Sequence, residues 1–291
     1  MSHYSANIDD FGMDSRTMAG PLEARLKAAR DAGFTQIMLS ASDLAGHAGG
    51  VDGAVAAVLA SGLRVTGFQT LADFEGLSGP LQAYKMDVAK SLLEMCHALG
   101  CHVLVVSSST LTQAARDTPT LIRNLRQLAM LAIPMNIRIA YKAWSQGTVV
   151  KEFMQAWDLV CQADMPSLGL CLDTAEMLAT GASQEDLDFL DSEKLFLVQL
   201  ADSMQVTAPY FRMFPGEGEH KDALANWVTT LHGLGYRGDY SLAVFNEDYQ
   251  QLPPGDVALR AWSSALWLGQ DVLQRSVPLP NQLRLKRRLA A

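Results

Sequence analysis

Short, nearly continuous apolar runs alternate with longer stretches of helical periodicity along the whole chain. Parallel strands that are buried on both faces give apolar runs of this kind, so we expect each run to be a strand. The predicted strands are residues 5–8, 36–40, 64–70, 102–107, 138–141, 168–172, 195–200 and 240–245. The predicted helices between them are residues 18–31, 51–61, 81–99, 118–131, 149–162, 175–190, 223–234 and 257–273.

Glycines mark the points where several of these helices are expected to end. Gly33, Gly62, Gly100 and Gly235 each follow a helical stretch and precede an apolar run. Glycine closes a helix at such a position because it adopts the left-handed conformation without steric cost. The regular placement of these glycines therefore supports a repeated helix-to-strand unit.

Eight β/α units in a chain of 291 residues predict one α/β domain, a single (β/α)8 TIM barrel. A doubly wound sheet is the alternative interpretation, but no Gly-rich phosphate loop follows the first predicted strand. We assign the barrel to residues 1–275. A Pro-containing break at 276–280 begins a C-terminal basic tail, residues 276–291.

The composition excludes several classes of protein. Hydrophobic residues make up 49% of the chain, too many for a disordered protein. Asp and Glu outnumber Lys and Arg by 31 to 23, so we expect no nucleic-acid partner. No apolar run reaches the ~18 residues of a membrane span, and the N-terminus has no secretory h-region. The four cysteines form no C-x-x-C pair, so we expect buried, reduced thiols in a cytoplasmic protein.

Polar residues at the carboxyl ends of the strands are the candidates for chemistry, because barrel enzymes carry their sites there. These candidates include Gln69, Ser107, Lys142, Asp173, Gln199 and Asn246. Asp173 ends the apolar run SLGLCLD and is a metal ligand or general base, the N-cap of the next helix, or both together. Gln199 lies within an apolar run, so its amide either faces the site or makes a structural hydrogen bond.

Lys142 is unusual because it ends an apolar strand. If it points inward near Asp173, its ammonium lies beside an acid in a partly desolvated mouth; otherwise its side chain extends outward to solvent. Glu176 follows Asp173 by three residues, which places both acids on one helix face. Either the two carboxylates act as an acid and base pair, or Glu176 only stabilises the first turn of the helix through the helix dipole.

A Gly/Pro loop, YFRMFPGEGEH, places Arg212 between aromatic residues. A planar guanidinium binds carboxylate or phosphate groups bidentately, so Arg212 is a candidate substrate clamp. His47 and His220 are each either an acid/base group or an ordinary surface histidine. The six histidines show no metal-binding spacing, which weakens any histidine-based metal site.

At these residues the sequence resembles the xylose-isomerase-like TIM barrels of the sugar phosphate isomerase/epimerase superfamily, and within them most closely the bacterial 3-dehydroshikimate dehydratases. The resemblance runs over residues 32–248. The segments that carry it are GFTQIMLSASDL, GLRVTGFQTLADFEG, LGLCLDTAEML, KLFLVQLAD, FRMFPGEGE and GYRGDYSLAVFNEDY. Barrels of this family often self-associate, so the resemblance also implies a possible homo-oligomer.

The resemblance implies one divalent metal with four ligands: a Glu after strand five, an Asp after strand six, a Gln or His after strand seven and a Glu on strand eight. Asp173 and Gln199 retain two of these ligands, while Lys142 and Ala243 fall at the two glutamate positions. Glu176 falls where the family has a histidine. The family's arginine in the FRDFEG segment falls on Ala72, whereas the arginine of FRMFPGEG is retained as Arg212.

A hard divalent cation needs several oxygen ligands, so these replacements argue against a metal bound as in the family. We therefore expect no cofactor and a metal-independent lyase or isomerase. It acts on a small hydroxylated keto acid or sugar acid by proton abstraction next to a carbonyl. Lys142, Asp173 and Glu176 are the expected catalytic residues. The expected substrate-binding residues are Gln69, Ser107, Gln199, Arg212 and Asn246.

Three alternatives stay open. In the first, Lys142 forms a Schiff base with the substrate carbonyl. In the second, the barrel is a non-catalytic pseudoenzyme that binds a small ligand or a partner protein. In the third, a rebuilt site with Asp173, Gln199, Glu176 and Glu247 binds Mn, Mg or Co.

Overall fold

The computed structural model describes residues 11–204 and 211–274. Within them, eight parallel strands close into one barrel in the order β1-β10-β7-β6-β5-β4-β3-β2. The barrel strands are β1 (Phe11–Asp14), β2 (Gln36–Ser40), β3 (Arg64–Ala72), β4 (Val103–Ser107), β5 (Arg138–Lys142), β6 (Leu168–Asp173), β7 (Leu195–Leu200) and β10 (Tyr240–Leu242). The α/β barrel expected from the alternating pattern is confirmed.

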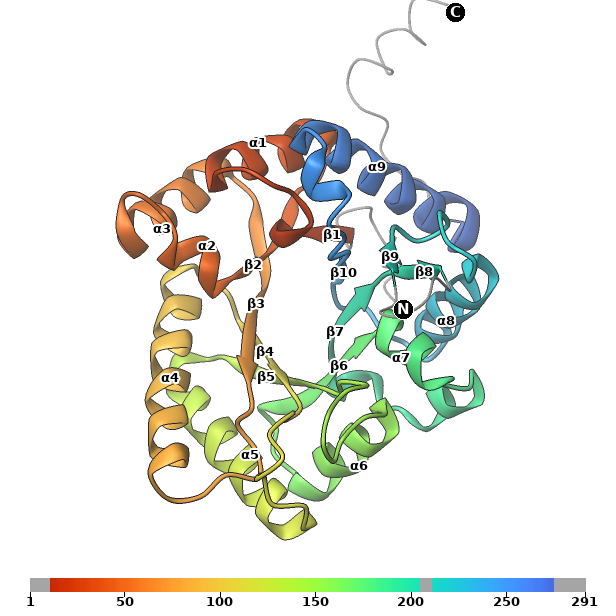
Figure 1. Ribbon diagram of the computed structural model, residues 1–291. Helices are drawn as coiled ribbons and strands as arrows, with labels where there is room; N and C mark the ends of the chain where they lie inside the picture. Colours follow the sequence, from red (N-terminus) through yellow and green to blue (C-terminus); the bar gives the residue numbers. More distant parts are fainter. Residues whose placement is uncertain (1–10, 205–210, 275–291) are drawn as a thin grey trace, which may run out of the picture.

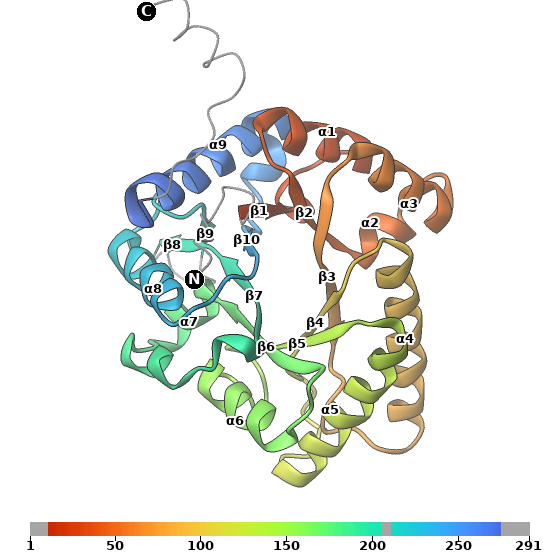
Figure 2. The same cartoon turned by 180° about the vertical axis from the view of Figure 1, so that it is seen from behind.

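Helices surround the strands in a ring, and the two opposite views show them on the outside of the barrel (Figures 1 and 2). They are α1 (Leu22–Ala32), α2 (Ala41–Ala45), α3 (Gly50–Ser61), α4 (Gly79–Ala98), α5 (Thr118–Ala132), α6 (Phe153–Ala163), α7 (Thr174–Thr180), α8 (Lys221–Gly233) and α9 (Pro254–Leu266). Short 3-10 turns lie at Ser15–Thr17, Ile133–Met135, Glu185–Phe189, Ser192–Lys194 and Tyr249–Gln251, and a π-helical turn at Trp267–Val272.

A small antiparallel sheet is an addition to the barrel that the pattern did not predict. It pairs β8 (Asp202–Met204) with β9 (Phe211–Met213), in the segment between β7 and α8. Each strand has only three residues, too few for the period-two alternation that reveals a strand in sequence. This sheet carries Arg212.

Apolar side chains fill the barrel in two places. A buried cluster inside the strands includes Met38, Val105, Cys171 and Leu197, and a larger cluster fills the layer between the strands and the helices. The strands are buried on both faces, which explains why they read as continuous apolar runs. Polar residues at the carboxyl ends of these strands are therefore easily recognised in the sequence, because the residues before them are apolar.

The first predicted strand, residues 5–8, lies outside the described residues, as does the predicted basic tail, 276–291. The first strand of the described barrel is β1, whose sequence FGMD is short and contains a glycine and an acid. The interval from β1 to α1 holds Arg16 in a 3-10 turn, a residue that the sequence analysis did not single out.

Several helix boundaries differ from the prediction for local reasons. The predicted helix 175–190 ends early as α7, because Gly181 adopts a left-handed conformation (φ 67°). The four glycines predicted to close helices all have positive φ, from 65° at Gly100 to 118° at Gly33. That prediction is confirmed.

Three of the four cysteines are buried, as expected, but Cys161 is exposed on α6, so the expectation of buried thiols was wrong there. No helix in the described part of the chain is long and apolar enough to cross a membrane.

Candidate active site at the carboxyl end of the barrel

Lys142 points into the mouth of the barrel. Its Nζ lies 3.1 Å from Asp173 Oδ2 and 2.7 Å from Gln199 Oε1, and its side chain is only 3% exposed. Strand register explains the meeting, since Asp173 pairs with Gln199 across β6 and β7, and Lys142 ends the adjacent β5. The inward orientation is confirmed, and the alternative of an outward-pointing lysine was wrong.

Arg212 completes a buried ionic cluster with these residues. Its Nη1 lies 3.1 Å from Asp173 Oδ2, and its Nη2 lies 2.6 Å from Glu176 Oε1. Asp173 also caps α7 by accepting a hydrogen bond from the Ala175 amide at 3.1 Å, so its capping role is confirmed. The four charged side chains form a cluster with two positive and two negative charges, which we call the Lys142–Asp173–Arg212–Glu176 cluster.

The electrostatics of the cluster keep Asp173 ionised. Burial alone would raise the pKa of the Asp173 carboxyl, but the Arg212 guanidinium and the Lys142 ammonium outweigh burial and lower that pKa to about 2. Burial would lower the pKa of Arg212, whereas Asp173 and Glu176 raise it above its ordinary value. Asp173 therefore stays a carboxylate at neutral pH, in contact with both Lys142 and Arg212.

A row of amides connects the cluster to the first strand. Gln199 Nε2 donates to Gln69 Oε1 at 3.0 Å, and Gln69 Nε2 donates to Asp14 Oδ2. All three side chains are fully buried. Because Gln199 Nε2 donates to Gln69, the carbonyl oxygen of the same amide group must face the opposite way, toward Lys142.

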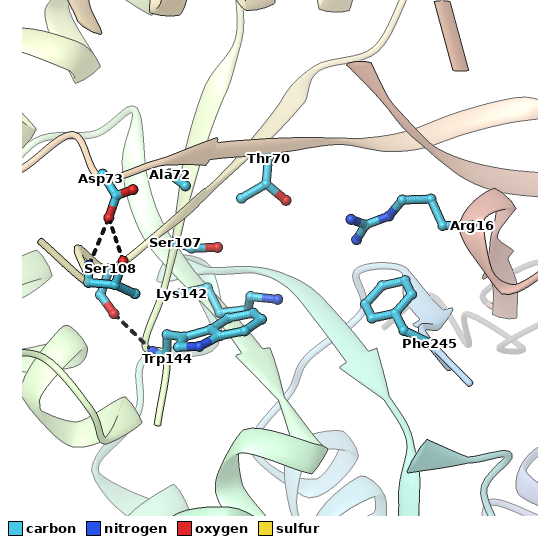
Figure 3. A pocket seen from close by; sticks show the side chains of 10 residues that line it. Arg16, Thr70, Ala72, Asp73, Ser107, Ser108, Lys142, Trp144 and Phe245 are labelled. Atoms are coloured by element: carbon cyan, nitrogen blue, oxygen red, sulfur yellow. Dashed lines mark hydrogen bonds between the residues drawn. The ribbon is translucent and has the colours of Figure 1, made fainter. Parts of the chain in front are cut away.

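A pocket of about 330 Å³ opens beside Lys142 (Figure 3). Residues that line it are Arg16, Thr70, Ala72, Asp73, Ser107, Ser108, Thr110, Lys142, Trp144 and Phe245. Lys142 and Ser107 are the members of this wall that we predicted as catalytic or substrate-binding residues, and Thr70, Ser108 and Phe245 lie at the strand ends where we expected the site. Sequence analysis missed Arg16, Asp73 and Trp144, because they lie just beyond strands, in turns with no hydrophobic period.

The other predicted substrate-binding residues have internal partners and are not part of this wall. Gln69 and Gln199 belong to the amide row, and Arg212 to the ionic cluster. Asn246 donates from Nδ2 to the carbonyl oxygen of Arg212 at 2.9 Å. Their direct contact with a substrate stays a prediction, while the contacts found here hold the cluster in place.

A cation and an apolar residue, Lys142 and Ala243, stand at two of the positions where the resemblance implies ligands of a divalent metal. The Lys142 ammonium lies between the two oxygens that would be retained as ligands, Asp173 Oδ2 and Gln199 Oε1. Ala243 supplies no side-chain donor, and its carbonyl oxygen accepts from Arg212 Nη1 at 3.4 Å. Within residues 11–204 and 211–274, no three His, Cys, Asp or Glu side chains are placed to bind a metal.

Replacing Arg212 by methionine is expected to lower the free energy of unfolding by about 3–5 kcal/mol at pH 7, because two buried carboxylates lose a cation. The pKa of Asp173, about 2, lies below its ordinary 3.8, so the stability from its ion pairs exists above pH 4 and is lost toward pH 2. The difference between wild type and variant should therefore shrink below pH 4. Urea unfolding from pH 7 to pH 3 measures it.

Arg237→Met is a matched control, because the Arg237 guanidinium bonds mainly its own loop, including the His232 carbonyl at 2.8 Å. It should lower stability by less than about 1 kcal/mol. Equal losses in the two variants, or a loss in Arg212→Met that is constant down to pH 3, would contradict the ionic cluster.

Comparison with known proteins agrees with the barrel fold. The family model described as xylose isomerase-like TIM barrel matches residues 26–266. A 3-dehydroshikimate dehydratase of Pseudomonas aeruginosa is 32% identical over 271 residues, which are 90% of this chain and 42% of that protein. An inosose isomerase of Bacillus licheniformis is 26% identical over 171 residues, 56% of this chain and 61% of that protein.

The structure of a protein described as a xylose isomerase-like TIM barrel/4-hydroxyphenylpyruvate dioxygenase fusion superposes with a TM-score of 0.85 at 28% identity. The match covers 96% of this chain and 44% of that one. This chain thus spans less than half the length of the dehydratase and of the fusion protein. Fold, motifs and family model agree, and we conclude that the chain belongs to the xylose isomerase-like TIM barrel family.

Proposed function

We propose that this barrel is a metal-independent enzyme of the dehydratase or isomerase type, acting on a small hydroxylated keto acid. Relatives named 3-dehydroshikimate dehydratase and inosose isomerase support a reaction that begins with proton abstraction next to a carbonyl. One observation carries the proposal: the Lys142 ammonium is fixed between Asp173 and Gln199, at 3.1 and 2.7 Å. A positive charge is thereby held where the family places a metal.

Lys142 is proposed to stabilise the oxyanion that develops on the substrate carbonyl. An ammonium group has three donors, and within the described residues Asp173 and Gln199 accept two of them. Lys142 also lines the pocket, so the third proton is available to a bound carbonyl oxygen. A fixed donor of this kind contributes about 10²–10³ in rate.

The same contacts favour an electrostatic role for Lys142 over a Schiff base. Asp173 and Gln199 hold the Lys142 Nζ at 3.1 and 2.7 Å, so attack on a carbonyl carbon would require this nitrogen to give up those contacts. Asp173 and Glu176 do not line the pocket, and both bind Arg212. Their proposed role is to set the electrostatic potential at Lys142. Borohydride trapping of a keto acid on the wild type, lost in Lys142→Ala, would instead establish the Schiff base.

Asp73 is the proposed proton acceptor. It lines the pocket, and its Oδ1 accepts from the amide of Thr110 at 2.8 Å, while no described residue donates to Oδ2. Its backbone is left-handed (φ 56°), a strained conformation for a residue other than glycine and one that recurs at functional sites. Figure 3 shows Asp73 at the end of the pocket away from Arg16.

The proposed steps balance without a further reactant. The Asp73 carboxylate takes the proton from the carbon next to the carbonyl, and the electron pair of that C–H bond forms an enolate whose oxygen accepts from Lys142. In a dehydration, the enolate re-forms the carbonyl and expels the hydroxyl on the next carbon. That hydroxyl takes the proton from Asp73 and leaves as water. In an isomerisation, the hydroxyl proton of the enediolate passes to the former carbonyl oxygen, and Asp73 returns its proton to the former carbonyl carbon.

Turnover after treatment with a chelator tests the proposal. Protein dialysed against EDTA is expected to convert 3-dehydroshikimate, followed by the absorbance of its dehydrated product, at a rate unchanged by added Mn²⁺, Mg²⁺ or Co²⁺. Asp73→Asn should lower the rate by about 10²–10⁴. Asp87→Asn, on the exposed face of α4, is the matched control and should leave it unchanged. Activity that disappears with EDTA and returns with metal would contradict the proposal.

A ligand-binding role without catalysis is the second candidate. It is supported by one observation, that both carboxylates of the Lys142–Asp173–Arg212–Glu176 cluster are already engaged with Arg212. Thermal stabilisation by the keto acid without any turnover, in the wild type and in Asp73→Asn alike, would favour this second function.

A further inference from the structure

We propose that Arg16 binds the carboxylate of the substrate, so that the pocket selects a small monocarboxylate over a neutral polyol ketone. The inference rests on the proposed function, since it names the substrate class for the same pocket. In this arrangement the ligand extends from Arg16, which binds its carboxylate, to Lys142, which binds its carbonyl oxygen.

Arg16 is held rigidly at the edge of the pocket. Its backbone amide donates to Asp14 Oδ1 at 2.9 Å, and its carbonyl oxygen accepts from Gln250 Nε2 at 2.7 Å. The guanidinium lies over the Phe245 ring, 4.1 Å from the ring centre. Backbone anchors and ring stacking leave the side chain little freedom to lose on binding, which favours tight recognition.

The guanidinium of Arg16 keeps its outer donors available. Its Nε lies 3.5 Å from Asp14 Oδ1, and within residues 11–204 and 211–274 no acceptor bonds either terminal nitrogen. Figure 3 shows these nitrogens inside the pocket, on the side that faces Lys142. The side chain is 33% exposed, so an incoming anion reaches it directly. Two parallel N–H donors match the two oxygens of a carboxylate.

The charges around the pocket also favour an anion at this end. Arg16 and Lys142 are the cations of the described wall, and Asp173 neutralises Lys142 at 3.1 Å. The buried Asp14 balances Arg16 less closely, because it approaches only Nε of the guanidinium, at 3.5 Å. The acid of the wall, Asp73, lies at the far end, and Ala72 adds only a methyl group.

The size and walls of the pocket limit the ligand further. About 330 Å³ lies at the lower end of the volumes that hold small-molecule ligands, which suits a single ring with a few substituents. Trp144 and Phe245 provide flat apolar surface, and Thr70 and Ser107 provide hydroxyl groups. A cyclic hydroxylated keto acid matches this combination of one anion site, one oxyanion donor, apolar faces and hydroxyl partners.

The experiment compares three probes: 3-dehydroshikimate, its methyl ester, which differs from it only at the carboxylate, and an inosose, which is a neutral polyol ketone. Binding is measured by calorimetry and by tryptophan fluorescence on the full chain. The wild type is expected to bind the acid at least about 10-fold more tightly than the ester or the inosose. Arg16→Met should weaken acid binding by roughly 10- to 100-fold and leave ester binding within about 2-fold.

Two further variants test whether the effect comes from the guanidinium of Arg16 itself. Arg16→Lys keeps the charge beside Asp14 but loses the planar fork, so it should retain only part of the preference for the acid. Arg260→Met is the matched control, because Arg260 also pairs with a carboxylate, Glu217 at 3.1 Å, and lies over a tyrosine ring away from the pocket. It should bind every probe like the wild type.

Failure of this inference is distinguishable from failure of the proposed function. An acid-to-ester ratio that Arg16→Met leaves unchanged, equal losses for acid and ester, or no binding of the acid to the wild type would overturn the role of Arg16. Conversely, a protein that requires metal or gives no turnover, yet loses acid preference in Arg16→Met, would overturn the proposed function and leave the role of Arg16 in place.

Discussion

Replacing Lys142 by methionine is expected to lower turnover of the keto acid by about 10²–10³, because the oxyanion loses its fixed donor. The same change should lower the free energy of unfolding by about 3 kcal/mol, since the ionised Asp173 loses one of its two buried cations. Methionine retains the length of the side chain, so packing changes little. Steady-state kinetics and urea unfolding measure the two effects on one sample.

Lys194→Met is the control for this prediction. Lys194 is half-buried at the other end of the barrel, where its Nζ donates to the Met165 carbonyl at 2.6 Å. Its replacement removes a comparable lysine without touching the pocket and should leave turnover unchanged. If Lys142→Met turned over substrate as fast as the wild type, Lys142 would have no part in catalysis.

Introducing glutamate at both altered family positions, as Lys142→Glu with Ala243→Glu, is expected to create a divalent metal site. The double variant removes the ammonium from between Asp173 and Gln199 and adds two carboxylates, which gives the oxygen-rich donor set that Mn²⁺ or Mg²⁺ requires. After equilibration with Mn²⁺ and gel filtration, it should retain about one ion per chain. Thermal unfolding should then rise with added metal.

The single variant Lys142→Met separates two explanations of that result. It removes the ammonium but adds no oxygen donor, so it should retain no more metal than the wild type. A double variant that folds yet binds no metal would show that the mouth of this barrel lacks the geometry of a metal site. Metal binding by Lys142→Met alone would show that the ammonium merely excludes an otherwise complete site.

The barrel and part of the site could be predicted from the sequence for a physical reason. Strands buried on both faces read as apolar runs, so the polar residues that end them are visible, and Lys142, Asp173 and Gln199 were found in this way. Strand register then brings them together at the carboxyl edge. That alternation of apolar strand and polar end singled out Lys142 but left its orientation open, and the contacts with Asp173 and Gln199 show that it points inward.

Other parts of the site arise from tertiary packing and leave little local signal. Arg212 was expected as a substrate clamp, and the structure adds its ion pairs with Asp173 and Glu176, which depend on the short strand β9. Arg16 was missed because the first strand was predicted at residues 5–8 and not at Phe11–Asp14. With the strand placed correctly, the strand-end rule points to Asp14 and the turn that holds Arg16.

The metal content of the wild-type protein tests the central claim most directly. Protein equilibrated with Mn²⁺, Mg²⁺, Co²⁺ and Zn²⁺ in turn, then desalted and analysed for each element, is compared with the Lys142→Glu, Ala243→Glu variant treated in parallel. If the Lys142 ammonium occupies the place between Asp173 and Gln199, the wild type retains less than about 0.1 ion per chain. Retention of about one ion per chain, lost in Asp173→Asn, would contradict it.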